Sequence, residues 1–168
     1  MGYSERRVSR AYVSLGSNLG DRLAYLRAAV EALGRGPQEV LGISKVYETQ
    51  PVEVEEEQPY YLNCVAELEC GFSAIELLRY CQGVEGALGR ARKGEKAPRT
   101  IDLDVLLFGD EVIDEPGFEV PHRGVTRAFN LRGLADLDPA LHIPGRGRVG
   151  ELLAGTDLGG IEEVGELC

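Results

Sequence analysis

Four stretches of the chain show the pattern of apolar and polar positions that is typical of β-strands. Within residues 60–70 the alternation is clean, because Leu62 and Cys64 share one face while Tyr61 and Asn63 share the other. Successive side chains of a strand point to opposite faces of a sheet. One face of this strand is therefore apolar, and the other carries polar groups. The predicted strands span residues 10–15, 40–47, 60–70 and 100–108.

Apolar residues at helical spacing predict two long helices between these strands. The first begins after Asp21, a favourable N-cap, and ends near Gly34. The second begins at a capping box formed by Ser73 and Glu76. The residues of this helix expected to face inward are Ile75, Leu78, Cys81 and Val84, with Gln82 and Glu85 neighbours on its polar side.

The second half of the chain favours shorter elements. Gly109-Asp110 predicts a tight turn that continues through Ile113 as a hairpin. Residues 118–120 predict a further short strand. Thr126 is expected to cap a helix over residues 126–134, and another short helix is predicted over 149–153.

The order of these elements predicts the fold class. Strands and helices alternate early, whereas hairpins dominate later, which indicates an α+β fold with a largely antiparallel sheet flanked by helices. A chain of 168 residues is long enough for one domain with a proper core, so we expect a single domain over residues 1–168. The acidic, glycine-rich tail over 156–168 is expected to be poorly ordered.

Composition narrows the classes of function. The net charge of −10 argues against nucleic-acid binding, which needs a basic surface. No apolar run approaches the roughly 20 residues that cross a bilayer, and the first ten residues lack the apolar centre of a secretory signal. We therefore expect a cytoplasmic protein without a membrane partner. The four cysteines form no Cys-x-x-Cys pair, so neither a zinc site nor a disulfide framework is indicated.

The strongest chemical signal is a pair of aspartates in the strand over 100–108. Asp102 and Asp104 share one face and lie about 7 Å apart along the strand. Their mutual repulsion would be costly to bury, and a divalent cation such as Mg²⁺ removes that cost. The alternative is an exposed sheet face with two ordinary acids. Leu106 and Phe108, which are expected on the same face, count against it.

A basic segment precedes this strand. Residues 90–99 contain five basic side chains and only one acid, in a chain that is otherwise acidic. This contrast indicates a small anionic ligand, although a solvated loop is the alternative. Phosphoryl and pyrophosphoryl transfer need positive charge around the migrating group, and Arg99 lies next to the aspartate strand. No Gly-x-x-x-x-Gly-Lys-Ser/Thr motif is present, so the chain is not a P-loop enzyme.

Six separate segments resemble one known family. The chain is similar to the 6-hydroxymethyl-7,8-dihydropterin pyrophosphokinases of folate biosynthesis over residues 11–144. The matching segments are Gly16-Ser-Asn18, Tyr47-Glu-Thr49, Tyr61-Leu-Asn63, Pro98-Arg-Thr-Ile-Asp102-Leu-Asp104, Val120-Pro-His122 and Arg127-Ala-Phe129.

The resemblance implies both a reaction and a fold. The expected enzyme has a ferredoxin-like core and transfers pyrophosphate from ATP to the hydroxymethyl oxygen of the pterin, releasing AMP. Asp102 and Asp104 would hold two Mg²⁺ ions, and Arg90 and Arg99 would act with them in catalysis. The implied ATP-binding residues are Gln82, Glu85, Arg90, Arg92, Arg99, Val105, His122 and Arg127. The implied pterin-binding residues are Thr49, Val52, Tyr61, Asn63 and Phe129.

The chain also departs from the family pattern. The family commonly has a tryptophan ahead of the aspartate strand, whereas this chain has Glu95-Lys-Ala-Pro-Arg99 and no tryptophan at all. The usual second stacking partner of the pterin is therefore in doubt, and Lys96 could close the site differently. Two other hypotheses stay open: a pterin- or nucleotide-binding protein without catalysis, and a kinase that moves a single phosphate. A monomer is expected, with a dimer as the alternative.

Overall fold

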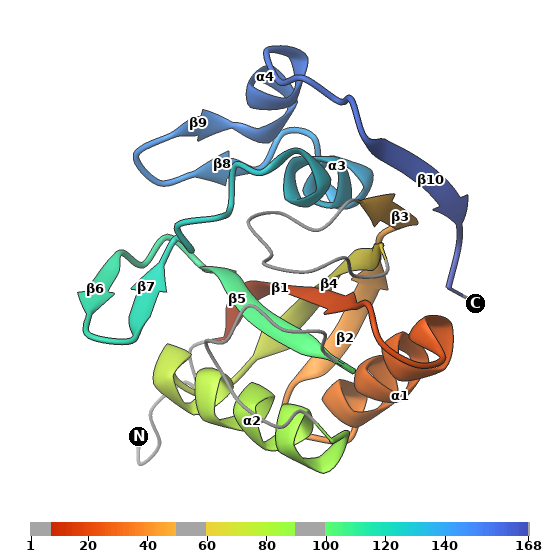
Figure 1. The fold of residues 1–168 in the computed structure, drawn as a ribbon. Helices are drawn as coiled ribbons and strands as arrows, with labels where there is room; N and C mark the ends of the chain where they lie inside the picture. Colours follow the sequence, from red (N-terminus) through yellow and green to blue (C-terminus); the bar gives the residue numbers. More distant parts are fainter. Residues whose placement is uncertain (1–7, 50–59, 90–99, 168) are drawn as a thin grey trace, which may run out of the picture.

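The computed structural model describes residues 8–49, 60–89 and 100–167. Within them, helices and strands follow one another along the whole chain, from a long first strand to a short last one (Figure 1). In order they are β1 (Ser9–Ser17), α1 (Arg22–Gly34), β2 (Glu39–Ile43), β3 (Val46–Thr49), β4 (Tyr61–Cys70), α2 (Ala74–Ala87), β5 (Asp102–Phe108), β6 (Ile113–Glu115), β7 (Phe118–Val120), α3 (Ala128–Leu137), β8 (His142–Ile143), β9 (Gly147–Arg148), α4 (Val149–Ala154) and β10 (Ile161–Gly165).

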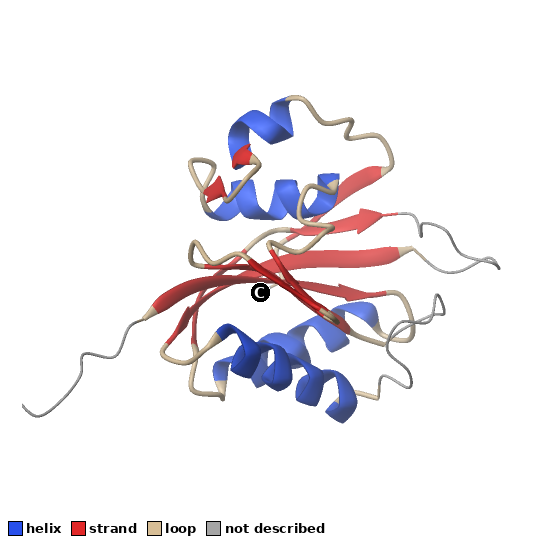
Figure 2. Cartoon of the chain, turned by 90° about the vertical axis from the view of Figure 1, so that its left-hand side faces the viewer, coloured by secondary structure: helices blue, strands red, loops and turns tan. Residues whose placement is uncertain are grey.

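A six-stranded antiparallel sheet lies at the centre of the molecule. Its strand order is β10-β3-β4-β1-β5, and β2 pairs with β4 farther along the same edge as β3. Helices α1 and α2 cover one face, and α3 and α4 lie on the other (Figures 1 and 2). The β1–α1–β2/β3–β4–α2–β5 path confirms the expected α+β fold with a ferredoxin-like core.

Each face of the sheet has its own apolar cluster. Leu62 and Cys64 belong to the cluster beneath α1 and α2, whereas Val65 belongs to the cluster beneath α3. The alternation predicted for β4 is therefore confirmed. The alternation predicted for β5 is interrupted near the end of that strand, because its register with β1 shifts between Tyr12 and Val13. As a result Phe108 packs on the α1/α2 side of the sheet. The expectation that it shares a face with the two aspartates is therefore wrong.

Both predicted N-caps of the long helices are confirmed. The Asp21 side chain accepts a hydrogen bond from the Ala24 amide (3.1 Å), and Ser73 and Glu76 form a reciprocal capping box. The inward face of α2 is rotated from the expected one. Ile75 is 37% exposed, and Leu77 is fully buried in its place.

Three predicted elements are wrong in detail. The single strand expected over 40–47 is broken after Ile43, where the Ser44 hydroxyl accepts a hydrogen bond from the Val65 amide. The expected hairpin partner of β5 is absent from the described residues, and β6 instead pairs with β7 around Gly117 (φ +80°). Helix α3 begins at Ala128 with Arg127 as its N-cap, so Thr126 is not the cap.

The acidic tail is partly ordered, contrary to expectation. Strand β10 pairs antiparallel with β3, with Ile161 opposite Thr49. Beyond it Leu167 is 3% exposed, and its carbonyl accepts a hydrogen bond from Arg27 Nε (3.1 Å). The tail therefore completes one edge of the sheet.

The three cysteines among the described residues behave as small apolar residues. Cys64, Cys70 and Cys81 are buried thiols without disulfides. Burial raises the pKa of Cys64 to about 12 and that of Cys70 to about 11, so neither forms a reactive thiolate near neutral pH. In the described part of the chain, no helix is long and apolar enough to cross a membrane.

Candidate active site

Two of the predicted site residues, Asn63 and Asp102, lie in one row that crosses the sheet. Gly16 on β1 lies opposite Asn63 on β4 and also opposite Asp102 on β5, and Asn63 in turn lies opposite Tyr47 on β3. Directly opposed residues point their side chains to the same face. For this row it is the face covered by α3, where Val65, two residues beyond Asn63, also packs.

Gly16 allows neighbouring side chains to lie close over the centre of this row. A Cβ atom at this position would lie 3.0 Å from Asn63 Oδ1 and 3.5 Å from Tyr61 Cδ1. Gly16 is itself buried, so the missing side chain lets the Asn63 amide and the Tyr61 ring pack closely over the backbone of β1.

The two aspartates of β5 occur next to a histidine. His122 Nε2 lies 3.6 Å from Asp104 Oδ1, and about a third of each side chain is exposed. The other ring nitrogen, Nδ1, accepts a hydrogen bond from the Gly124 amide (2.9 Å). A neutral imidazole with that partner carries its proton on Nε2, facing the aspartate. Among the described residues, no group of three or more His, Cys, Asp or Glu side chains could hold a metal ion.

A buried carboxylate holds the backbone between the two aspartates. Glu85 on α2 is 3% exposed, and its Oε2 accepts a hydrogen bond from the Leu103 amide (2.8 Å). The sequence predicts Glu85 on the polar side of α2. The structure instead uses it to link α2 to β5, a role that periodicity alone does not reveal.

Three of the predicted pterin-binding residues lie together. Thr49 is opposite Tyr61, and the Asn63 amide nitrogen donates to the Thr49 hydroxyl (2.8 Å). This bond fixes the Asn63 amide with its oxygen on the side of Gly16. Phe129 is half-buried in the first turn of α3, the helix above the same sheet face. Val52 lies outside the described residues.

The predicted ATP-binding residues are more scattered. Val105 is 2% exposed and packs on the α1/α2 side of the sheet, so only its main chain faces possible ligands. Gln82 is exposed on α2, and Arg127 is exposed at the N-cap of α3. The predicted site residues Arg90, Arg92 and Arg99 lie outside the described residues, as does Lys96.

Sequence reasoning missed a residue that joins the ends of β3 and β4. Arg22 Nη1, at the start of α1, donates to Glu48 Oε2 (2.9 Å) and to the Tyr60 carbonyl (2.7 Å). Glu48 and Tyr60 directly adjoin Thr49 and Tyr61. No local pattern could have found this contact, because its partners lie far away along the chain.

A family sequence model and individual related proteins all indicate one family. The sequence model of 7,8-dihydro-6-hydroxymethylpterin-pyrophosphokinase (HPPK) matches residues 12–139. The chain is 39% identical to a 2-amino-4-hydroxy-6-hydroxymethyldihydropteridine pyrophosphokinase from Pseudomonas aeruginosa, over 94% of this chain and 98% of that one. It is 43% identical to the enzyme of the same name from Bacillus subtilis, over 76% of this chain and 77% of the other.

Solved structures show the same fold at lower identity. The wild-type HPPK-DHPS of Plasmodium falciparum with STZ-DHP superposes with a TM-score of 0.73 at 14% identity. The match covers 91% of this chain and 44% of that one. At this identity the likeness concerns the fold alone.

Proposed function

Because the chain belongs to the 7,8-dihydro-6-hydroxymethylpterin-pyrophosphokinase family, we propose that the sheet face beneath α3 holds both of its substrates. The enzyme is an ATP-dependent diphosphotransferase of folate biosynthesis. It transfers pyrophosphate from ATP to 6-hydroxymethyl-7,8-dihydropterin, which leaves AMP. The observation that carries the proposed arrangement is the row in which Asn63, Gly16 and Asp102 lie opposite one another.

The two aspartates of β5 fit Mg²⁺. Asp102 and Asp104 present hard oxygen donors on one sheet face, and both stay partly exposed. Mg²⁺ takes one or two protein carboxylates and completes its octahedral shell with water and phosphate oxygens, so a pair of ligands is sufficient. We assign Asp102 and Asp104 as the protein ligands of two ions. When bound, Mg²⁺ would neutralise phosphate charge and polarise the attacking hydroxyl.

Positive side chains would hold the phosphates of ATP. Arg90 and Arg99 are assigned to catalysis on the strength of the family resemblance, because guanidinium groups bind phosphate oxygens in pairs. His122 would add an N–H donor beside Asp104, since its Nδ1 is already bonded to the Gly124 amide. The remaining residues assigned to ATP are Gln82, Glu85, Arg92, Val105 and Arg127.

The pterin would lie against β3 and β4. Its amino and lactam edge needs paired hydrogen-bonding groups, and its ring faces need aromatic contact. Asn63 is oriented for the first task, because its amide nitrogen donates to the Thr49 hydroxyl and its oxygen lies on the side of Gly16. Tyr61 and Phe129 are assigned to ring contact, and Val52 completes the proposed set.

Removal of either aspartate's charge tests this assignment. We expect Asp102→Asn and Asp104→Asn each to lower kcat by about a thousandfold or more, because each removes charge stabilisation of the transferring group. Pterin binding should change little. AMP release with Mg²⁺, ATP and the pterin is the measurement, and Asp110→Asn, at an exposed turn after β5, is the matched control. Full turnover in both aspartate variants would contradict the assignment, and ADP as product would indicate transfer of one phosphate.

We also propose that the chain acts in the cytoplasm as a monomer with one catalytic domain. The net charge of −10 supports small-molecule substrates rather than a nucleic-acid partner. Light scattering during gel filtration distinguishes the monomer from the alternative dimer.

A further inference from the structure

Tyr47 is buried beside the proposed pterin site but has no part in the chemistry assigned above. Its ring is 1% exposed, and its hydroxyl donates to Asp136 Oδ2 on α3 (2.6 Å). Burial, together with this carboxylate, raises the pKa of Tyr47 to about 12. The hydroxyl therefore stays protonated and remains a donor throughout the pH range in which the protein works.

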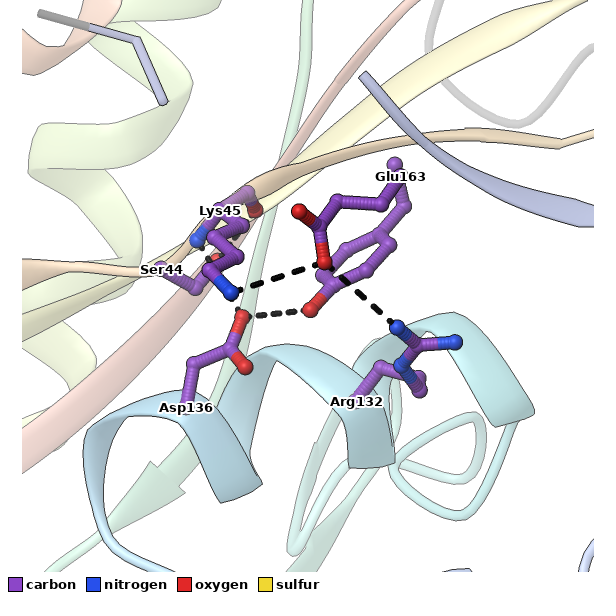
Figure 3. Close-up of polar contacts among 6 residues, drawn as sticks. Ser44, Lys45, Arg132, Asp136 and Glu163 are labelled. Carbon is purple, nitrogen blue, oxygen red and sulfur yellow. Dashed lines mark hydrogen bonds and ion pairs between the residues drawn. The ribbon is translucent and has the colours of Figure 1, made fainter. Parts of the chain in front are cut away.

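Other polar contacts surround this hydrogen bond (Figure 3). Asp136 Oδ2 also accepts from the Lys45 amide (3.2 Å), and the Arg132 guanidinium carbon lies 4.6 Å from the centre of the Tyr47 ring. Glu163 on β10 lies 3.5 Å from Lys45 Nζ and 3.8 Å from Arg132 Nη2. These ion pairs are partly exposed, and such pairs contribute little. The bond between Tyr47 and Asp136 is the main polar connection between sheet and helix in this cluster.

Helix α3 also packs very closely on the sheet here. A Cβ atom at Gly133 would lie 2.5 Å from Val65 Cγ2 and 3.2 Å from Ser44 Oγ. Only glycine permits this approach without displacing the helix. The hydrogen bond from Tyr47 is therefore made where the distance between helix and sheet is already tightly set.

The cluster connects the two sides of the proposed pterin site. Tyr47 lies directly opposite Asn63 in the register of β3 and β4. On α3, Phe129 precedes Arg132 by three residues and Asp136 by seven, so the three share one side of the helix. We propose that Tyr47 is a positioning residue, which sets the distance between Asn63 and Phe129 by joining β3 to α3. This proposal rests on the pterin site proposed above.

The variant Tyr47→Phe removes only the hydroxyl. We expect the KM for the pterin to rise about three- to tenfold, less than the full value of a hydrogen bond to a charged acceptor, because this bond acts on the pterin only through the position of Asn63 and Phe129. The KM for ATP should stay within about twofold, because the aspartates lie on β5 at the other side of the row. Asp136→Ala should raise the pterin KM at least as much, because it also removes the hydrogen bond from the Lys45 amide, and the double variant should be no worse than Asp136→Ala alone.

The matched control is Tyr12→Phe. Tyr12 is likewise buried, and its hydroxyl donates to Glu67 Oε2 (2.8 Å). It lies four residues from Gly16 on β1, about 13 Å along the strand. Tyr12→Phe should destabilise the fold about as much as Tyr47→Phe but leave both KM values unchanged. An equal rise of the pterin KM in the control would overturn the positioning role, because it would report general destabilisation.

Asn63→Ala separates this proposal from the site assignment. An unchanged pterin KM in Asn63→Ala would overturn the pterin site, and the proposal with it. A raised pterin KM in Asn63→Ala, with an unchanged one in Tyr47→Phe, would leave the site standing and overturn the positioning role. A rise in both variants, selective for the pterin, supports the proposal.

Discussion

At the scale of single residues, Gly16 determines how closely Asn63 and Tyr61 pack over β1. A methyl group at this position would contact Asn63 Oδ1 at 3.0 Å and Tyr61 Cδ1 at 3.5 Å. We expect Gly16→Ala to raise the KM for the pterin at least about tenfold, because small displacements of positioning groups are costly. The KM for ATP should change much less. Initial rates of AMP formation with each substrate varied in turn measure both constants.

The control for this variant is Gly71→Ala, since a Cβ atom at Gly71 would meet nothing within 4 Å. It carries the same chemical change immediately after β4, outside the row. Equal KM values in the two variants would mean that the surface at Gly16 does not hold the pterin.

Residues on the strands could be assigned to faces from the sequence, but their neighbours across the sheet could not. A period of two was enough to give Asp102 and Asp104 a shared face, and likewise Tyr61 and Asn63. The role of Gly16 depends on its being opposite both Asn63 and Asp102. That register follows from long-range pairing, which no local pattern contains. The role of Glu85 could not be predicted for a similar reason, because its hydrogen-bond partner is a main-chain amide of another element.

At the scale of elements, Arg22 joins α1 to the ends of β3 and β4. Its Nη1 binds both Glu48 Oε2 and the Tyr60 carbonyl, with about 29% of its side chain exposed. We expect Arg22→Met, which keeps the helix propensity, to lower the free energy of unfolding by about 1–2 kcal/mol, as for hydrogen bonds that involve a charged group. The KM for the pterin should rise in parallel, because Thr49 and Tyr61 adjoin the two acceptors.

Arg35→Met is the comparison for this variant. Arg35 pairs with Glu31 on the exposed side of α1, where both side chains are more than half exposed. Its loss should cost less than about 0.5 kcal/mol. Urea unfolding of the two variants side by side gives the difference, and equal values would show that Arg22 is an ordinary surface residue.

Elements with strong local signals were predicted well, and those that need a distant partner were not. Asp21 and the Ser73–Glu76 box marked their helices correctly because a cap satisfies amides within its own turn. The hairpin expected after β5 is wrong, since Gly117 offers a turn that pairs β6 with β7 instead. The acidic, glycine-rich composition of the tail predicts poor order. It becomes a strand only because β3 provides an edge.

At the scale of the whole molecule, the C-terminal segment packs against α1, the first helix of the chain. After β10, Leu167 packs into the cluster beneath α1 and α2, and its carbonyl binds Arg27 of α1. We expect Leu167→Ala to lower the free energy of unfolding by about 2–4 kcal/mol, as for other leucines removed from a core. Val164→Ala, on the 51% exposed neighbour in β10, should cost less than about 0.5 kcal/mol.

This variant also tests whether β10 supports the active site. If Leu167 anchors the strand that pairs with Thr49, then Leu167→Ala should raise the pterin KM as well as destabilise the fold, while the KM for ATP stays near its original value. Measurements below the unfolding temperature of the variant keep the two effects apart. Loss of stability with an unchanged pterin KM would mean that β4 and Arg22 alone hold Thr49 in place. A stability loss as small as that of Val164→Ala would show instead that the segment packs without contributing to the core.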